Sequence, residues 1–250
     1  FGWRAAFRYP PLLIIIAAIT LYLLVKDRPK NAGLKDYKET DPATAAIEKT
    51  SLEFKSRLQP YWFLFKNWKF MAASHVKGLE NVTRYGLATW APIYYFDKAD
   101  LSLESTIAVT IALPIGYLLG PMISGYVSDR WLTGQRTQMM ALSALLSATA
   151  FLGLAFIPPH NLLVGASLLF LGGFAMSLTL SAVLAVDMSG RHMAGTASGI
   201  LDAHGYLYAG AQAIIFAVVL HTANTPWPII FISMAIARFI SAGVMWRLRF

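Results

Sequence analysis

Residues 105–136, STIAVTIALPIGYLLGPMISGYVSDRWLTGQR, join an apolar run of membrane-spanning length to a short charged segment. Residues 105–127 are almost all apolar or small, which is typical of a helix that crosses a bilayer. Gly125 permits the close approach of a neighbouring helix, and Asp129 can stabilise the positive N-terminus of one. Arg130 and Arg136 hold the charged segment on the cytoplasmic side. The stretch predicts a helical protein that crosses a membrane more than once.

The composition supports the same class. Hydrophobic residues make up 56% of the 250 residues and charged residues only 14%. A soluble domain of this size could not bury so much apolar surface. Cysteine is absent, which excludes disulfides, thiolate nucleophiles and Cys-ligated metals. The net charge of +8 is concentrated between the apolar runs. That distribution indicates charge that sets membrane topology and not a surface for nucleic acid.

Seven apolar runs are about as long as a helix needs to be to cross a bilayer. With bounds uncertain by several residues, the predicted spans are Pro10–Val25, Phe70–Phe96, Ser105–Val127, Met139–Ile157, Leu162–Val186, Ala194–Leu220 and Pro228–Trp246. The expected fold class is therefore all-α and integral to a membrane, with about seven transmembrane helices.

Basic residues gather after the first, third, fifth and seventh runs, and the other connections are poor in Lys and Arg. By the positive-inside rule the chain is expected to start outside and to finish in the cytoplasm, in a cytoplasmic membrane. Phe1 is not an initiator Met, and no signal peptide follows it. The simplest interpretation is the C-terminal part of a longer protein.

The segment Gly125 to Arg136 resembles the cytoplasmic loop signature of the major facilitator superfamily, G-x-x-[SA]-D-[RK]-x-x-x-G-x-R. The matching positions are Gly125, Asp129, Arg130, Gly134 and Arg136. A plain stop-transfer cluster of charges is the alternative interpretation. Under both interpretations the loop serves conformation and does not bind substrate.

Two further stretches resemble one group within that superfamily, the organophosphate:phosphate antiporters. Arg84-Tyr85-Gly86 with Trp90 and Pro92 is similar to the group's seventh helix. The eleventh-helix resemblance rests on small residues, namely Gly195, Thr196, Ala197, Ser198, Gly199, Gly205 and Gly210. The ends of residues 1–26 are similar to the sixth helix.

The resemblance implies a division of the chain into three parts. Residues 1–26 would form a transmembrane helix equivalent to the sixth, 27–68 a cytoplasmic linker, and 69–250 the C-terminal six-helix bundle. The N-terminal bundle is missing here and would belong to the same or a separate chain.

Arg84 is the main candidate for substrate binding. A guanidinium at bilayer depth costs about 2.5–3.5 kcal/mol on the lenient insertion scale, and it is tolerated where it faces a polar cavity. Its planar fork suits phosphate and stays charged at any working pH. The resemblance implies that Arg84 binds the substrate phosphate together with an arginine of the missing first helix. A structural ion pair is the alternative.

Lys77, Glu80, Asn81 and Arg84 fall within an arc of about 100° on a helix, which is typical of a face towards a cavity. The antiporter group is less charged at the first three positions. In one account Glu80 neutralises Lys77 or Arg84. In the other, Lys77 adds a second anion contact and favours a more negative substrate. Lys77 and Asn81 are the secondary substrate contacts of this prediction.

The roles predicted for several other polar residues are less specific. Asp202 is predicted to be a counter-ion in the cavity, with a proton-coupling carboxylate as its alternative. Arg238 is expected to snorkel to the cytoplasmic surface, and Asp187 to be a solvated loop charge. Tyr94 and Tyr95 are expected in the outer aromatic belt of the membrane.

These observations favour a transporter over an enzyme. The histidines have no metal-ligand spacing, no serine nucleophile motif is present, and no nucleotide-binding loop appears. No catalytic residue, metal or cofactor is predicted. The resemblance implies exchange of an organophosphate for inorganic phosphate by alternating access. The alternatives are a sugar-phosphate sensor of the same fold and a proton-coupled transporter of another organic anion.

Overall fold

The computed structural model describes residues 2–26, 29–34, 46–47, 49, 54–56, 58–131, 136–179, 181–222 and 227–248. Within these ranges the regular elements are all helices. The chain forms two compact units, Phe1–Pro42 and Ala43–Phe250. Parts of the predicted linker at 27–68 lie outside the described residues, among them 27–28, 35–45 and 50–53.

The first unit consists mainly of helix α1 (Gly2–Leu24), followed by a short 3₁₀ turn, η1 (Pro29–Ala32). Residues Phe7–Leu24 of α1 are long and apolar enough to cross a membrane. Pro10 and Pro11 lie inside this helix without ending it. This helix overlaps the first predicted span.

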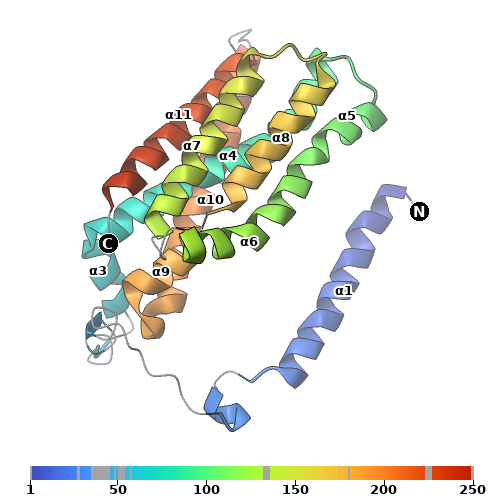
Figure 1. The fold of residues 1–250 in the computed structure, drawn as a ribbon. Helices are drawn as coiled ribbons and strands as arrows, with labels where there is room; N and C mark the ends of the chain where they lie inside the picture. Colours follow the sequence, from blue (N-terminus) through green and yellow to red (C-terminus); the bar gives the residue numbers. More distant parts are fainter. Residues whose placement is uncertain are drawn as a thin grey trace. The chain divides into compact units, whose positions relative to one another are not determined.

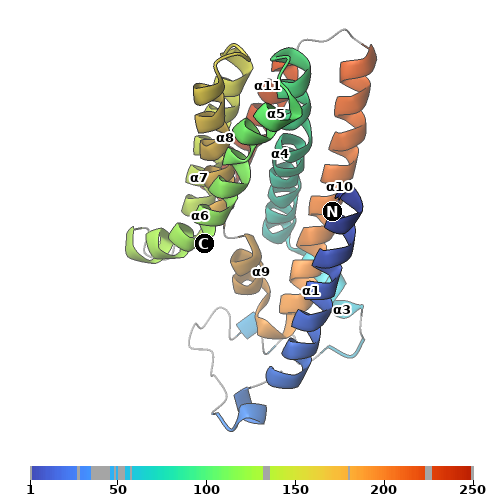
Figure 2. The same cartoon turned by 90° about the vertical axis from the view of Figure 1, so that its right-hand side faces the viewer.

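The second unit is a helical bundle (Figures 1 and 2). Its elements in chain order are α3 (Gln59–Lys66), α4 (Trp68–Lys98), α5 (Leu103–Thr110), α6 (Ala112–Trp131), α7 (Arg136–Phe156), α8 (Leu162–Ser177), α9 (Ser181–Ser189), η2 (Arg191–Met193), α10 (Ala194–Thr222) and α11 (Pro228–Arg247). The main packing pairs are α7 with α11, α6 with α8, and α4 with α10.

Helix α4 carries the predicted polar stripe. The side chain of Asn67 caps its start by accepting hydrogen bonds from the backbone N–H groups of Lys69 and Phe70. The helix has 31 residues and continues through Pro92, so it is about 46 Å long and can span a bilayer. It is not among the helices apolar enough to be recognised as spans by composition, because its middle carries charged side chains.

Two predicted spans are interrupted in the structure. The span over residues 105–127 bends at Ile111, between α5 and α6, where Pro114 has no N–H to donate to the preceding turn. The span over 162–186 ends as a helix at Ser177 and resumes at Ser181. Hydroxyl side chains at such positions bond to nearby backbone and compete with the helix. Ser177 does so, donating to the Phe174 carbonyl at 2.9 Å.

Glycines allow the closest helix crossings. A Cβ at Gly116 or Gly120 of α6 would overlap backbone of α8, and one at Gly173 of α8 would overlap backbone at Leu113. On α4, Gly78 lies against the ring of Tyr208 on α10. Small residues let membrane helices approach until their backbones touch.

The apolar core consists of two clusters separated along the helices by polar residues. One cluster contains Leu87 to Tyr95 of α4, together with Phe151 and Phe231. The other contains Phe70 to Val76 of α4, together with Met140 and Met245. Between the two positions lie buried polar side chains of α4, α7 and α11, which we call the polar layer. Its members are Glu80, Asn81, Thr83, Ser143, Ser147, Arg238 and Ser241.

Tyr94 and Tyr95 do not form an outer belt. Their exposed fractions are 6% and 2%. The ring centroid of Tyr94 lies 5.4 Å from that of Trp227 and 5.1 Å from that of Phe231. The belt expectation was wrong because Trp227 and the start of α11 cover the ring of Tyr94, and the hydroxyl end of Tyr95 lies against Gly165 of α8.

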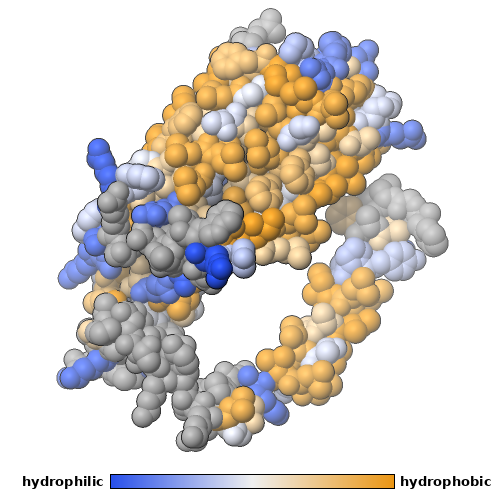
Figure 3. Space-filling model, in the orientation of Figure 1, coloured by the Kyte–Doolittle hydropathy of each residue, from blue (hydrophilic) through white to orange (hydrophobic). Residues whose placement is uncertain are grey.

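The surface of the bundle fits a membrane. Figure 3 shows hydrophobic residues over the middle of the visible face and hydrophilic residues near its ends. Five helices of the described chain are long and apolar enough to cross a membrane, and α8 is a shorter apolar helix. The prediction of an all-helical membrane bundle is confirmed. Two of the seven predicted spans are not among these five helices. Helix α4 is too polar to be recognised by composition, and α8 is shorter than the length required.

We expect Gly116→Val to disrupt the crossing of α6 and α8. The added side chain must displace backbone of α8, and overpacking of this kind costs about 1–3 kcal/mol or more. The measurement is the thermal unfolding midpoint in detergent. The matched control is Gly243→Ala on α11, where a Cβ meets no atom within 4 Å. Equal midpoints for the two variants would contradict the close crossing.

Candidate functional site

A cavity of about 390 Å³ lies beside the polar layer. Its walls come from α4, α6 and the segment joining α8 to α9. The residues that line it are Lys77, Glu80, Arg84, Pro121, Ser124, Gly125, Ser177, Thr179, Ser181 and Val183. Three of the four residues of the predicted stripe therefore share one cavity with a wall rich in hydroxyl groups.

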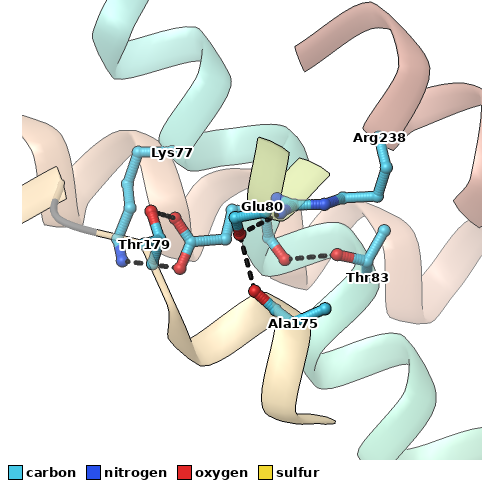
Figure 4. Close-up of polar contacts among 7 residues, drawn as sticks. Lys77, Glu80, Thr83, Ala175, Thr179 and Arg238 are labelled. Atoms are coloured by element: carbon cyan, nitrogen blue, oxygen red, sulfur yellow. Dashed lines mark hydrogen bonds and ion pairs between the residues drawn. The ribbon is translucent and has the colours of Figure 1, made fainter. Parts of the chain in front are cut away.

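Glu80 is the centre of the contacts at this cavity (Figure 4). Its Oε1 lies 3.4 Å from Nζ of Lys77, and its Oε2 accepts a hydrogen bond from Oγ1 of Thr179 at 3.3 Å. The side chains of Lys77 and Glu80 are 13% and 1% exposed. Thr83 donates to the Glu80 carbonyl at 2.7 Å. The Glu80 carboxylate therefore engages the ammonium of Lys77. Through Thr179 it also links α4 to the break between α8 and α9.

Arg84 is half-buried. It lies about one helical turn after Glu80 and about two turns after Lys77 on α4. Its Cζ is 5.1 Å from the ring centroid of Tyr117 on α6, a cation–π contact. The Tyr117 hydroxyl donates to the Arg84 carbonyl at 3.3 Å. Among the residues that the structure describes, no carboxylate forms an ion pair with Arg84. Arg84 lines the cavity, and a guanidinium offers paired donors suited to an anion.

Asn81 and Asp202 have different surroundings. Asn81 is 4% exposed. Its amide lies where a Cβ on Gly205 of α10 would be, so it packs between helices and is not one of the lining residues. Asp202 is exposed on α10. It has no ion pair within the described parts of the chain, and its role as a cavity counter-ion stays a prediction.

The small-residue face of α10 does not pack within this chain. A Cβ on Gly195, Gly199 or Gly210 would meet no atom within 4 Å. The close approach on α10 occurs instead at Gly205, on another face of the helix. Small residues suit close packing, but helical periodicity does not say which face the neighbouring helix takes.

Arg238 was missed by sequence reasoning. It does not snorkel: it is 2% exposed. Its Nε donates to Oγ of Ser147 at 2.7 Å and its Nη2 to Oγ of Ser143 at 3.2 Å. α11 continues to Arg247, which leaves Arg238 more than two turns inside the bundle. The signal that could have found it is Ser143 and Ser147 at i, i+4 on an otherwise apolar helix.

The loop motif contributes to both the cavity and the surface. Gly125 lines the cavity, and Arg130 is exposed in the last turn of α6. Asp187 of α9 is exposed, as expected of a solvated charge, and it also forms an ion pair with Arg136. Gly134 and the side chain of Asp129 lie outside the described residues, and their roles stay predictions.

Comparison with known proteins identifies the family. The family model of the Major Facilitator Superfamily matches residues 1–213 and 108–250. The chain therefore belongs to the major facilitator superfamily. It is a multi-pass membrane protein by its family and by its apolar helices.

Several curated relatives carry names that refer to phosphorylated solutes. The glycerol-3-phosphate transporter of Bacillus subtilis (strain 168) is 25% identical over 215 residues, covering 84% of this chain and 48% of the relative. The probable hexose phosphate transport protein of Chlamydia pneumoniae is 27% identical over 226 residues, 83% of this chain and 49% of the relative.

A sensor is also among the relatives. The membrane sensor protein UhpC of Escherichia coli (strain K12) is 25% identical over 248 residues, covering 97% of this chain and 56% of the relative. The chain spans about half the length of the curated relatives it matches.

We expect Glu80→Gln to destabilise the protein far more than Asp187→Asn. Loss of the buried carboxylate leaves Lys77 without its ion-pair partner, which costs about 3 kcal/mol. The partially exposed Arg136–Asp187 pair is worth about 1 kcal/mol or less. Thermal unfolding in detergent measures both variants. Similar midpoints for the two would contradict a structural role for the Glu80 ion pair.

Proposed function

We propose that this chain forms the C-terminal half of a secondary transporter that exchanges an organophosphate for inorganic phosphate. The observation that carries the proposal is the half-buried guanidinium of Arg84. It lines a cavity within a membrane bundle and has no carboxylate partner in the described chain. The names of the relatives, which include a hexose-6-phosphate:phosphate antiporter of Salmonella typhimurium, support phosphate as the anion.

In this proposal Arg84 binds the phosphoryl group or inorganic phosphate. Lys77 is a secondary contact that shares its charge with Glu80. The hydroxyl group of Ser181 lines the same cavity and is a suitable donor to phosphate oxygens, whereas Ser124, which also lines it, already donates to the Pro121 carbonyl at 3.1 Å. Asn81, predicted from the sequence as a secondary substrate contact, is not assigned that contact here, because its amide lies against α10.

The half-transporter needs a companion bundle. We propose that an N-terminal six-helix bundle, in the same or a separate chain, completes the site and that the two bundles rock about it. We propose that the C-terminus lies in the cytoplasm and the protein in the inner membrane, which the positive-inside rule supports through the basic connections. Phosphate gradients drive exchange in this scheme, and no cofactor takes part.

A sensor is the second candidate function. The sensor UhpC matches nearly the whole chain, and a receptor would use the same phosphate contacts without turnover. Phosphate binding without counterflow in proteoliposomes selects the sensor.

A proton-coupled transporter of another organic anion is the remaining alternative. It needs a titratable carboxylate, for which Asp202 is the candidate. Uptake that follows the pH gradient and is lost in Asp202→Asn selects this function. Exchange that needs inorganic phosphate on the opposite side, with no effect of the pH gradient, selects the antiporter.

We expect Arg84→Gln to abolish phosphate counterflow by the complete protein in proteoliposomes. We expect Arg84→Lys to lower counterflow about 10- to 100-fold, because hydrogen bonds to charged groups are worth about 1.5–3 kcal/mol and Lys lacks the paired donors. The matched control is Lys98→Gln, an exposed cation at the end of the same helix. Counterflow that survives Arg84→Gln would contradict the proposal.

A further inference from the structure

Arg238 is a buried cation in the middle of α11 with neutral hydrogen-bond partners. The two serine hydroxyls that contact it donate their own protons elsewhere. Ser143 donates to the Ala175 carbonyl of α8 at 2.6 Å, and Ser147 to the Ser143 carbonyl at 2.9 Å. Both hydroxyls therefore present lone pairs to Arg238. The guanidinium is held in one position by α7, which is itself bonded to α8.

Neutral acceptors do not cancel a charge, and a buried guanidinium needs a counter-charge to be tolerated. No ion pair to Arg238 is found within the described ranges. Among the described residues Glu80 is the buried carboxylate, and it lies in the same polar layer as Arg238. In Figure 4, Arg238 and Lys77 approach Glu80 from opposite sides. Lys77 therefore offsets the charge of Glu80 at the cavity, and Arg238 is a second cation buried in the same polar layer.

The shared carboxylate matters when an anion binds. Lys77 lines the cavity, but its ammonium is engaged by Glu80 at 3.4 Å. An anion that recruits Lys77 must draw it away from Glu80. A carboxylate that is 1% exposed would then be left in the bundle without a partner charge, which is strongly unfavourable. Arg238 does not line the cavity and stays in place, so its charge offsets that cost.

We propose that Arg238 is a positioning residue of the phosphate site, which compensates Glu80 when Lys77 turns to the ligand. The inference rests on the proposed function, because it requires an anion in the cavity. It assigns to α11 a part in ligand binding that no contact with the cavity reveals. It also predicts that the effect of Arg238 on binding disappears when Glu80 is neutral.

The test measures the affinity of the complete protein for inorganic phosphate, by isothermal titration in detergent. We expect Arg238→Met to weaken phosphate binding about tenfold, within the range of coupling between residues of one network. Arg238→Lys keeps the charge and should bind close to the parent. The double variant Glu80→Gln/Arg238→Met should recover to within about threefold of the parent, because neutral Gln needs no counter-charge.

Lys77→Gln supplies a second readout. It should weaken binding in the parent but have little further effect in Arg238→Met, where Lys77 already stays on Glu80. The matched control is Arg247→Gln, an exposed arginine in the last turn of the same helix, which should bind like the parent. A purely structural role for Arg238 predicts additive losses and no recovery with Glu80→Gln.

The outcomes separate the two proposals. A parent that binds phosphate, with additive losses and no recovery in the double variant, overturns the role of Arg238 alone. A parent that binds no phosphate, like Arg84→Gln, contradicts the proposed function and with it this inference. If Arg238→Met does not fold, the double variant decides. Its binding within about threefold of the parent supports the proposal, and a loss of about tenfold or more overturns it.

Discussion

The middle of the bundle depends on one buried anion, the carboxylate of Glu80. It is 1% exposed, and a charge in such a place must have partners or the helix around it is not stable. Within the described residues those partners are Lys77 on the same turn and Thr179 at the break between α8 and α9, and we propose Arg238 on α11 as a further counter-charge. Apolar residues would fill this layer at lower cost. The polar layer therefore has the character of a functional feature maintained at the expense of stability.

The same arrangement explains why Arg84 is available. Glu80 is the acidic residue that lines the cavity, and Lys77 and Thr179 already contact it. Arg84 is oriented by Tyr117 through the face of its ring and is left without a carboxylate in the described chain. An interrupted helix at the cavity wall adds hydroxyl groups and free backbone, as in other transporters whose sites lie at broken helices. The anion that we propose as the ligand is compatible with this distribution of donors.

Much of the fold could be predicted from the sequence. The long apolar runs located the helices, and the polar stripe of Lys77, Glu80 and Arg84 located one wall of the cavity. The errors share a physical cause. Tyr94 and Arg238 were each assigned from their own helix and its nearest end. Their environments are set instead by α11 and by the serines of α7, neither of which is close to them in sequence.

By itself the sequence determined the class of protein, the family and the face of α4 that carries the charges. Hydropathy and helical periodicity are local properties, and they are sufficient for those conclusions. Only the tertiary structure decided that Glu80 takes Lys77 and leaves Arg84 without an ion pair. It also decided that Arg238 is buried in the same polar layer as Glu80. The break in the span over 162–186, at the cavity, is likewise a result of the tertiary structure. Each of these depends on which helix lies opposite, and the energy of a buried charge depends on every neighbour that surrounds it.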